Sequence, residues 1–263
     1  MTLRSDLIGT AAMFAAIFWW PPNVARAGPP LIADDPNTVG PGVVQPIFAA
    51  SALNRGDETL VRGPIADVTI GLVDSLDAIV VSSLLSLHDT SENPRWTLSG
   101  FFAVGVKWQF FRADRGSLAF TPTFITETAA AREPAGLLPI QGELTLRDRK
   151  GVIGFDIGYA PIRRVDDEWF VALYASWAAT RRLNILGEIW AVAFGRAEAA
   201  DIGASLGIDY GIFGKDLRLL AAVSPGIVST GMPRLDIHAY VGAQYTLGSR
   251  RDRWRSTRSN GFK

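Results

Sequence analysis

The chain has 263 residues, with 26 basic and 26 acidic side chains and no cysteine. The absence of cysteine excludes disulfide bonds, thiolate metal ligands, cysteine nucleophiles and a lipid anchor on cysteine. Nearly every apolar segment ends at strand length, which argues against a helical soluble domain and against a helical inner-membrane protein.

Residues 1–27 have the pattern of a secretory signal peptide. Arg4 gives a positive amino-terminal region, residues 7–20 are apolar, and Ala-Arg-Ala at 25–27 forms a small-residue cleavage site. The apolar stretch is shorter than the roughly 20 residues that span a bilayer, and two prolines follow it, which argues against an uncleaved membrane helix. We therefore expect export across the inner membrane and cleavage after Ala27.

Residues 28–42 are rich in proline and glycine, include Asp34, Asp35 and Pro36, and show no periodicity, which predicts an irregular segment. Apolar and polar residues then alternate in short segments from residue 43 to residue 248, as in strands with one wet and one dry face. The predicted strands are 43–53, 60–73, 77–87, 97–111, 117–127, 139–147, 151–160, 168–177, 182–192, 200–210, 215–224 and 236–247. About twelve strands, an even number, predict an all-β, transmembrane, antiparallel up-and-down β-barrel.

The predicted connections differ in length. Those at 88–96, 128–138 and 225–235 are long, whereas the breaks after residues 73 and 111 are short. Barrels of this class have short periplasmic turns and longer extracellular loops. With both ends of the barrel chain in the periplasm, all three long connections fall on the extracellular side.

Alternation also assigns side chains to the two faces of the barrel wall. Val106, Trp108 and Phe110 fall on one face, and Lys107 and Gln109 on the other. The apolar set must face lipid, because a charge placed there costs roughly 2–4 kcal/mol for Arg or Lys near the midplane.

The polar set therefore faces the lumen. Its members carry both signs of charge, which permits pairs that brace or fill the interior. The predicted lumen-lining residues are Asp67, Lys107, Gln109, Glu143, Arg147, Asp156, Glu188, Asp209, Arg218, His238 and Gln244.

Residues 249–263 form a basic tail in which Trp254 and Phe262 are the large apolar side chains. Positive charge attracts nucleic acid or anionic lipid headgroups. Since no pattern beyond charge accompanies it, we expect a solvated, disordered end and no nucleic-acid partner.

Catalytic and metal-binding signals are weak. His88, in a predicted loop, and His238, in the last predicted strand, are the two histidines, and neither shows the His-x-Ser pairing of outer-membrane lipid hydrolases. Two separated histidines without cysteine do not form a zinc site, and no glycine-rich phosphate loop is present. We expect no enzymatic activity, no metal and no cofactor.

Three stretches carry a family resemblance: GPPLIADDPNTVGPG at the mature start, GFFAVGVKWQFF, and DEWFVALYASWAATRRLNILGEIW. Together they resemble the outer-membrane barrel family named for the MetA pathway of phenol degradation, over nearly all of the mature chain. Matching elements are Asp34-Asp35-Pro36 and the strands at 104–110 and 183–189. Thr126-Glu127-Thr128 departs from a frequent Pro-Thr-Gly element, and the basic tail departs from the usual aromatic end.

The resemblance implies a channel-like barrel that helps hydrophobic or aromatic compounds cross the outer membrane, and it implies no catalytic residue. From the residues themselves, a barrel of this size could equally be a non-transporting structural or surface-binding protein. We expect a monomer in the bacterial outer membrane. Its expected partners are outer-membrane lipid, the barrel-insertion machinery during biogenesis, and a small-molecule solute.

Overall fold

The computed structural model describes residues 31, 33–83, 85–90, 95–97, 100–127, 135–146, 150–161, 167–180, 182–195, 199–213, 216–231 and 235–248. The predicted signal peptide and the predicted basic tail lie outside these residues. Among the described residues, none forms a helix with the length and apolar character needed to cross a membrane.

Fifteen strand segments make one sheet. In chain order they are β1 Val44–Arg55, β2 Glu58–Val73, β3 Leu76–Ser83, β4 Ser86–Thr90, β5 Arg95–Thr97, β6 Phe101–Arg112, β7 Gly116–Phe120, β8 Thr123–Glu127, β9 Ala135–Thr145, β10 Gly151–Ala160, β11 Glu168–Ala178, β12 Leu183–Phe194, β13 Ala199–Phe213, β14 Leu217–Thr230 and β15 Leu235–Tyr245. Three strands of the barrel each consist of two segments. β3 and β4 both pair with β2, and β6 and β5 pair with β3 and β4, respectively. β7 and β8 both lie between β6 and β9.

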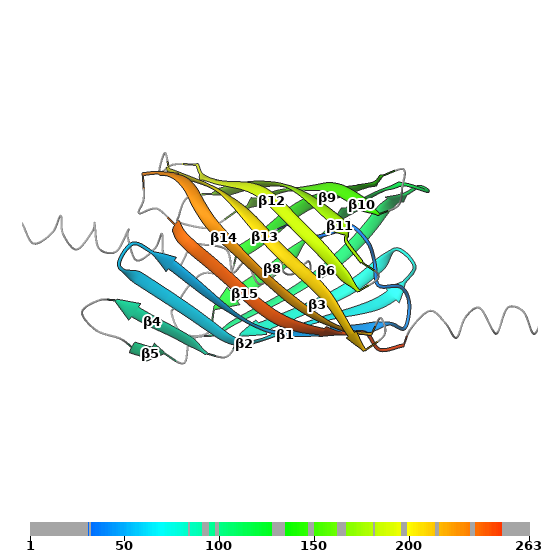
Figure 1. Ribbon diagram of the computed structural model, residues 1–263, viewed down its shortest axis with the longest axis horizontal. Coiled ribbons are helices and arrows are strands. Elements are labelled where there is room, and N and C mark those ends of the chain that lie inside the picture. The colour runs from blue at the N-terminus through cyan, green and yellow to red at the C-terminus, as the bar shows by residue number, and fades with distance from the viewer. Residues whose placement is uncertain are drawn as a thin grey trace, which may run out of the picture.

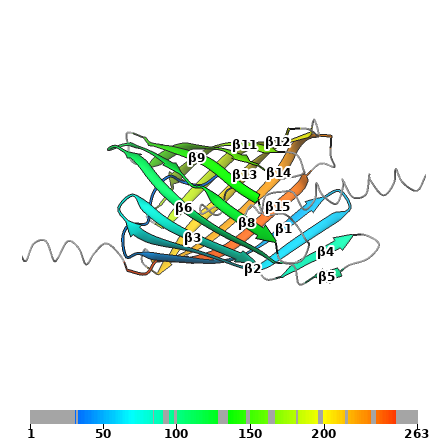
Figure 2. The ribbon, with the colours of Figure 1, turned by 180° about the vertical axis from the view of Figure 1, so that it is seen from behind.

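The result is a closed barrel of twelve antiparallel strands. Each strand pairs with its neighbours in the sequence, and β1 closes the barrel by pairing with both β2 and β15. The strands are strongly tilted (Figures 1 and 2). Closure satisfies backbone hydrogen bonds without a free sheet edge, which a bilayer requires. The predicted fold class and strand number are therefore confirmed.

The two ends of the barrel differ. β1 begins and β15 ends at one end, which we call the termini end, on the right in Figure 1. The opposite end, which we call the loop end, carries the three connections predicted to be extracellular. All three were predicted too long. β4 and β5 extend a hairpin into the predicted 88–96 connection, β9 begins at Ala135 inside the predicted 128–138 connection, and β14 continues to Thr230 instead of ending at residue 224.

Pro225 was read as the end of a strand, yet it lies within β14. On one side, Pro225 pairs with Ile237 of β15. On the other side, β14 pairs with β13 through Gly226 with Gly203 and Val223 with Leu206, and no paired position lies between these two. A proline is tolerated in a sheet where its missing amide is not needed by the neighbouring strand. The predicted 225–235 connection is accordingly shorter.

Large apolar side chains cover the outside of the barrel. Leu173, Ile189 and Leu206 are each about 60% exposed, at 61%, 62% and 62%. The predicted outward residues Val106 and Trp108 are exposed as well. An apolar surface of this extent is unfavourable in water but matches the lipid-facing band of a transmembrane barrel.

Candidate functional site

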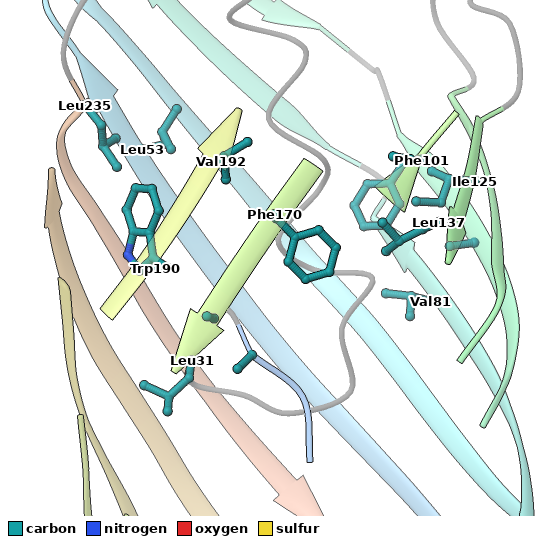
Figure 3. Close-up of a cluster of buried hydrophobic side chains, with 14 of the residues drawn as sticks. Leu31, Leu53, Val81, Phe101, Ile125, Leu137, Phe170, Trp190, Val192 and Leu235 are labelled. Atoms are coloured by element: carbon teal, nitrogen blue, oxygen red, sulfur yellow. The ribbon is translucent and has the colours of Figure 1, made fainter. Parts of the chain in front are cut away.

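The barrel lumen has two chemically distinct halves. Toward the termini end the buried inward side chains are polar or charged, and we call this the polar half: Asp67, Thr69, Asp77, Lys107, Gln109, Ser117, Gln141, Asp156 and Glu188. Toward the loop end apolar side chains form a cluster, and we call this the apolar half: Leu53, Leu60, Val81, Phe101, Ile125, Leu137, Phe170, Trp190, Val192 and Leu235. The charged side chains of Arg55, Glu168 and Asp201 are also buried at this end. Figure 3, which labels all of these except Leu60, shows the side chains projecting inward from strands on different sides of the barrel.

The amino-terminal segment enters the lumen from the termini end. Residues 33–43, which we call the plug, precede β1, and Ala33 and Asp34 are fully enclosed. Leu31 reaches the cluster of the apolar half. The sequence predicted only an irregular segment here, because a segment without periodicity gives no indication of what it packs against.

Glycines allow the plug to turn back into the barrel. Gly40 and Gly42 have positive φ values of 92° and 73°, which side chains disfavour. The amide of Gly42 donates to the carbonyl of Gly71 at 2.9 Å. A Cβ atom on Gly71 would lie 1.7 Å from the carbonyl oxygen of Gly40. The base of the plug is thus pressed directly against the backbone of β2.

Carboxylates of the barrel wall bind the backbone of the plug. The amides of Ala33, Asp34 and Val39 donate to Glu188, Asp156 and Asp77 at 2.5, 3.1 and 2.9 Å, respectively. These acceptors come from β12, β10 and β3. Hydrogen bonds to ionised groups contribute about 1.5–3 kcal/mol each, so the contacts anchor an otherwise irregular segment.

Lys107 of β6 provides the opposite charge. Its Nζ donates to Oδ1 of Asp34 at 3.0 Å and to the carbonyl of Asp35 at 2.7 Å, and lies 2.9 Å from Oδ2 of Asp34. Both side chains of this ion pair are buried. Burial raises the pKa of the Asp34 carboxyl well above its ordinary value, while Lys107 opposes that rise.

Asn37 adds a third set of plug contacts. Its Nδ2 donates to Oε1 of Glu143 at 3.0 Å, and its Oδ1 accepts from Gln109 at 3.4 Å and from Ser117 at 3.3 Å. Tyr174 donates its hydroxyl to the other oxygen of Glu143 at 3.3 Å. Five of the predicted lumen-lining residues therefore contact the plug: Lys107, Gln109, Glu143, Asp156 and Glu188.

The remaining predicted residues lie elsewhere. Arg218 forms a bidentate ion pair with Asp209, near the termini end. Asp67 is buried in the polar half, and Gln244 is half-buried on β15. His238 is buried, but on the side of the apolar half. Arg147 lies outside the described residues.

Some buried lumen residues were not among the predicted lumen-lining set. Near the loop end Arg55 forms a buried ion pair with Asp201, and Ser229 donates to the same carboxylate. Asp77 is also buried, against the plug. The two-residue alternation could have predicted both positions. Asp77 lies an even number of residues from the inward Val81, and Arg55 from the inward Leu53.

A metal centre is not evident in the lumen. Within the residues that the structure describes, no three His, Cys, Asp or Glu side chains are placed to hold a metal ion. The carboxylates of the polar half instead face plug amides and Lys107. This arrangement binds the backbone of an irregular segment through carboxylates and one ammonium group.

The closed barrel, its apolar outer surface and its enclosed lumen define a bacterial outer-membrane β-barrel. No protein-family model matches the sequence, and no curated protein matches it. Among solved structures, an outer membrane channel from Pseudomonas putida F1 is similar with a TM-score of 0.61 and 8% identity, covering 81% of this chain and 98% of that one.

Two porins are similar to nearly the same extent. The KdgM porin gives a TM-score of 0.57 at 9% identity, covering 78% of this chain and 99% of the porin. The NanC porin gives a TM-score of 0.57 at 10% identity, covering 77% of this chain and 100% of the porin. At such identities the likeness is one of fold.

Proposed function

We propose that this protein is an outer-membrane channel for small apolar solutes, aromatic compounds included. The observation that carries the proposal is the apolar half of the lumen. A passage for hydrophilic solutes is lined with polar groups that replace water. Phe101, Phe170 and Val192 instead offer a solute dispersion contacts and no hydrogen bonds, and the indole N–H of Trp190 is already donated to Ser224. The resemblance to the family named for the MetA pathway of phenol degradation supports the same solute class.

The path of a solute follows from the two halves. With the loop end outside the cell, an apolar molecule partitions first into the apolar half. Leu31 reaches the apolar half, and the plug lies between that half and the termini end. We propose that the plug moves during passage, because its contacts with the wall are hydrogen bonds and one ion pair that can break and reform. We propose that the barrel acts as a monomer, inserted by the barrel-insertion machinery.

Uptake of an apolar dye tests the proposal. Cells that produce the protein in their outer membrane should take up N-phenyl-1-naphthylamine faster than cells with an empty vector. Val192→Asn places an amide in the apolar half and should slow this uptake. The matched control is Val171→Asn. Val171 faces lipid on the neighbouring strand β11, next to Phe170, the strand partner of Val192. The two variants are compared at equal amounts of folded barrel.

Equal uptake by Val192→Asn and its control would contradict transport through the apolar half. No uptake above the empty vector, with a heat-modifiable folded barrel present, would favour the second candidate, a non-transporting barrel that binds partners at its surface. The observation that favours this candidate is the plug, which enters the polar half and binds its charged side chains.

A further inference from the structure

A continuous chain of hydrogen bonds connects the apolar half to the plug. Nε1 of Trp190 donates to Oγ of Ser224 at 2.9 Å, and Ser224 lies 2.8 Å from Oγ of Ser205. Ser205 donates to Oε2 of Glu188 at 2.9 Å, and Oε1 of Glu188 accepts the amide of Ala33 at 2.5 Å. All five residues are buried. We call the four wall residues the Trp190 relay.

The chemistry of the groups fixes the direction of every bond in the relay. An indole N–H only donates and an ionised carboxylate only accepts. Ser205 donates to Glu188, so the bond between the two serines is donated by Ser224, whose oxygen accepts from Trp190. With Glu188 ionised, each hydroxyl is thus used once as donor and once as acceptor.

The sheet register places the relay across three neighbouring strands. Glu188 of β12 pairs with Ser205 of β13. Ser205 stands opposite Ser224 of β14, since the flanking pairs are Gly203 with Gly226 and Leu206 with Val223. The three side chains therefore form one row on the inner wall.

Trp190 reaches this row because its strand neighbour is a glycine. Trp190 pairs with Gly203. A Cβ atom on Gly203 would lie 2.2 Å from Cζ2 of the indole. The bare backbone lets the ring lie over β13 and bring Nε1 to Ser224, while the rest of the ring belongs to the cluster of the apolar half.

A displacement of the ring changes the hold on the plug. If the indole leaves Ser224, a buried hydroxyl loses its donor and is free to turn, and each bond further along loses its fixed orientation. Buried hydrogen bonds of this kind contribute about 0.5–1.5 kcal/mol and strengthen one another in chains. Glu188 is where this wall network meets the plug backbone.

We propose that the Trp190 relay couples occupancy of the apolar half to release of the plug. An apolar aromatic solute that contacts the indole shifts the ring from Ser224, and the hydrogen bond that the amide of Ala33 donates to Glu188 weakens. The coupling by solute rests on the proposed function. The mechanical link between Trp190 and the plug does not, so the two can be tested separately.

A unique thiol reports plug release, because the natural chain has no cysteine. Ala33→Cys in lipid nanodiscs, with both barrel ends open to solvent, is labelled with a membrane-impermeant maleimide only when the plug leaves its site. In this background Trp190→Phe keeps an aromatic ring but loses the donor, and Ser224→Ala and Ser205→Ala remove the next links.

Each of the three variants should speed labelling about fivefold, and pairs of them should give no more than either alone, because the links act in series. Trp169→Phe, on the lipid-facing side of β11, is the matched control and should leave the rate unchanged. Faster labelling for Ser205→Ala but not for Trp190→Phe would overturn the proposal, since Trp190 would then be unlinked from the plug.

Naphthalene supplies the solute arm. It should speed labelling of Ala33→Cys by a similar factor and have no further effect in the Trp190→Phe variant. Faster labelling by naphthalene that persists unchanged in Trp190→Phe would refute coupling through the relay. Failure of the proposed function would appear differently, as dye uptake at the empty-vector level with the effects of the three relay variants intact.

Discussion

Replacing Lys107 with methionine removes the buried ammonium group that binds the plug. The side chain keeps its length but loses three contacts, to both carboxylate oxygens of Asp34 and to the carbonyl of Asp35. Asp34 then lies buried near Asp156 without its cation. We expect the plug to leave its site far more often, while the barrel itself stays folded.

The magnitude follows from the burial of the pair. Removing one partner of a buried ion pair costs about 3–5 kcal/mol, and about 1.4 kcal/mol corresponds to a factor of ten. Protonation of Asp34, whose pKa burial already raises, recovers part of that cost, so the lower figure applies. The labelling rate of Ala33→Cys should increase about 100-fold, with a parallel increase in open time in planar bilayers.

Two variants make this prediction specific. Lys150→Met removes an exposed lysine in a turn at the termini end and should change neither quantity. Adding Asp34→Asn to Lys107→Met removes the stranded charge and should restore most of the slow labelling. A Lys107→Met protein with the labelling rate of its parent would refute the view that this ion pair holds the plug.

Three further outcomes are expected. Burial raises the pKa of Asp34 in the seated plug, so seating binds a proton. Conductance should therefore be lowest near about pH 4, the ordinary range of the Asp pKa, and should increase as pH rises through the raised pKa of Asp34. Asp34→Asn should reduce this pH dependence. A conductance that decreases as pH rises would contradict the prediction. Gly71→Ala should loosen the plug or impair folding, because its Cβ would meet Gly40, whereas Gly187→Ala, with nothing within 4 Å, should be neutral in heat-modified gel mobility. Leu173→Arg, at the middle of β11 and facing lipid, should cost about 2–4 kcal/mol in urea unfolding in lipid vesicles, and Leu173→Ala much less.

Strand periodicity explains how much of the barrel wall was predictable. In β6, Trp108 faces lipid and Lys107 faces the lumen, as their alternation predicts. The period of two is a property of the strand itself, so it can be read without knowing the partner strand. Strand ends were less predictable: Pro225 signals a break locally, but its place within β14 depends on how β13 and β15 pair on either side.

The division of the lumen was not predicted from the sequence. Polar inward residues were recognised because they interrupt apolar surroundings. Inward Phe170 and Val192 look the same in sequence as lipid-facing residues next to them, since both environments are apolar. Parity places Phe170 inward, between the lipid-facing Trp169 and Val171, but only the closure of the barrel gathers it with apolar side chains from other strands at the loop end.

The sequence by itself determined the barrel, its strand number and the inward position of Lys107, Asp156 and Glu188, because alternation and segment length are local. The tertiary structure alone decided what these residues bind. The plug has no periodicity, and its contacts with Glu188, Asp156 and Lys107 join positions 155, 122 and 73 residues apart in the chain. Such contacts exist only once the sheet has closed and brought β6, β10 and β12 around one lumen.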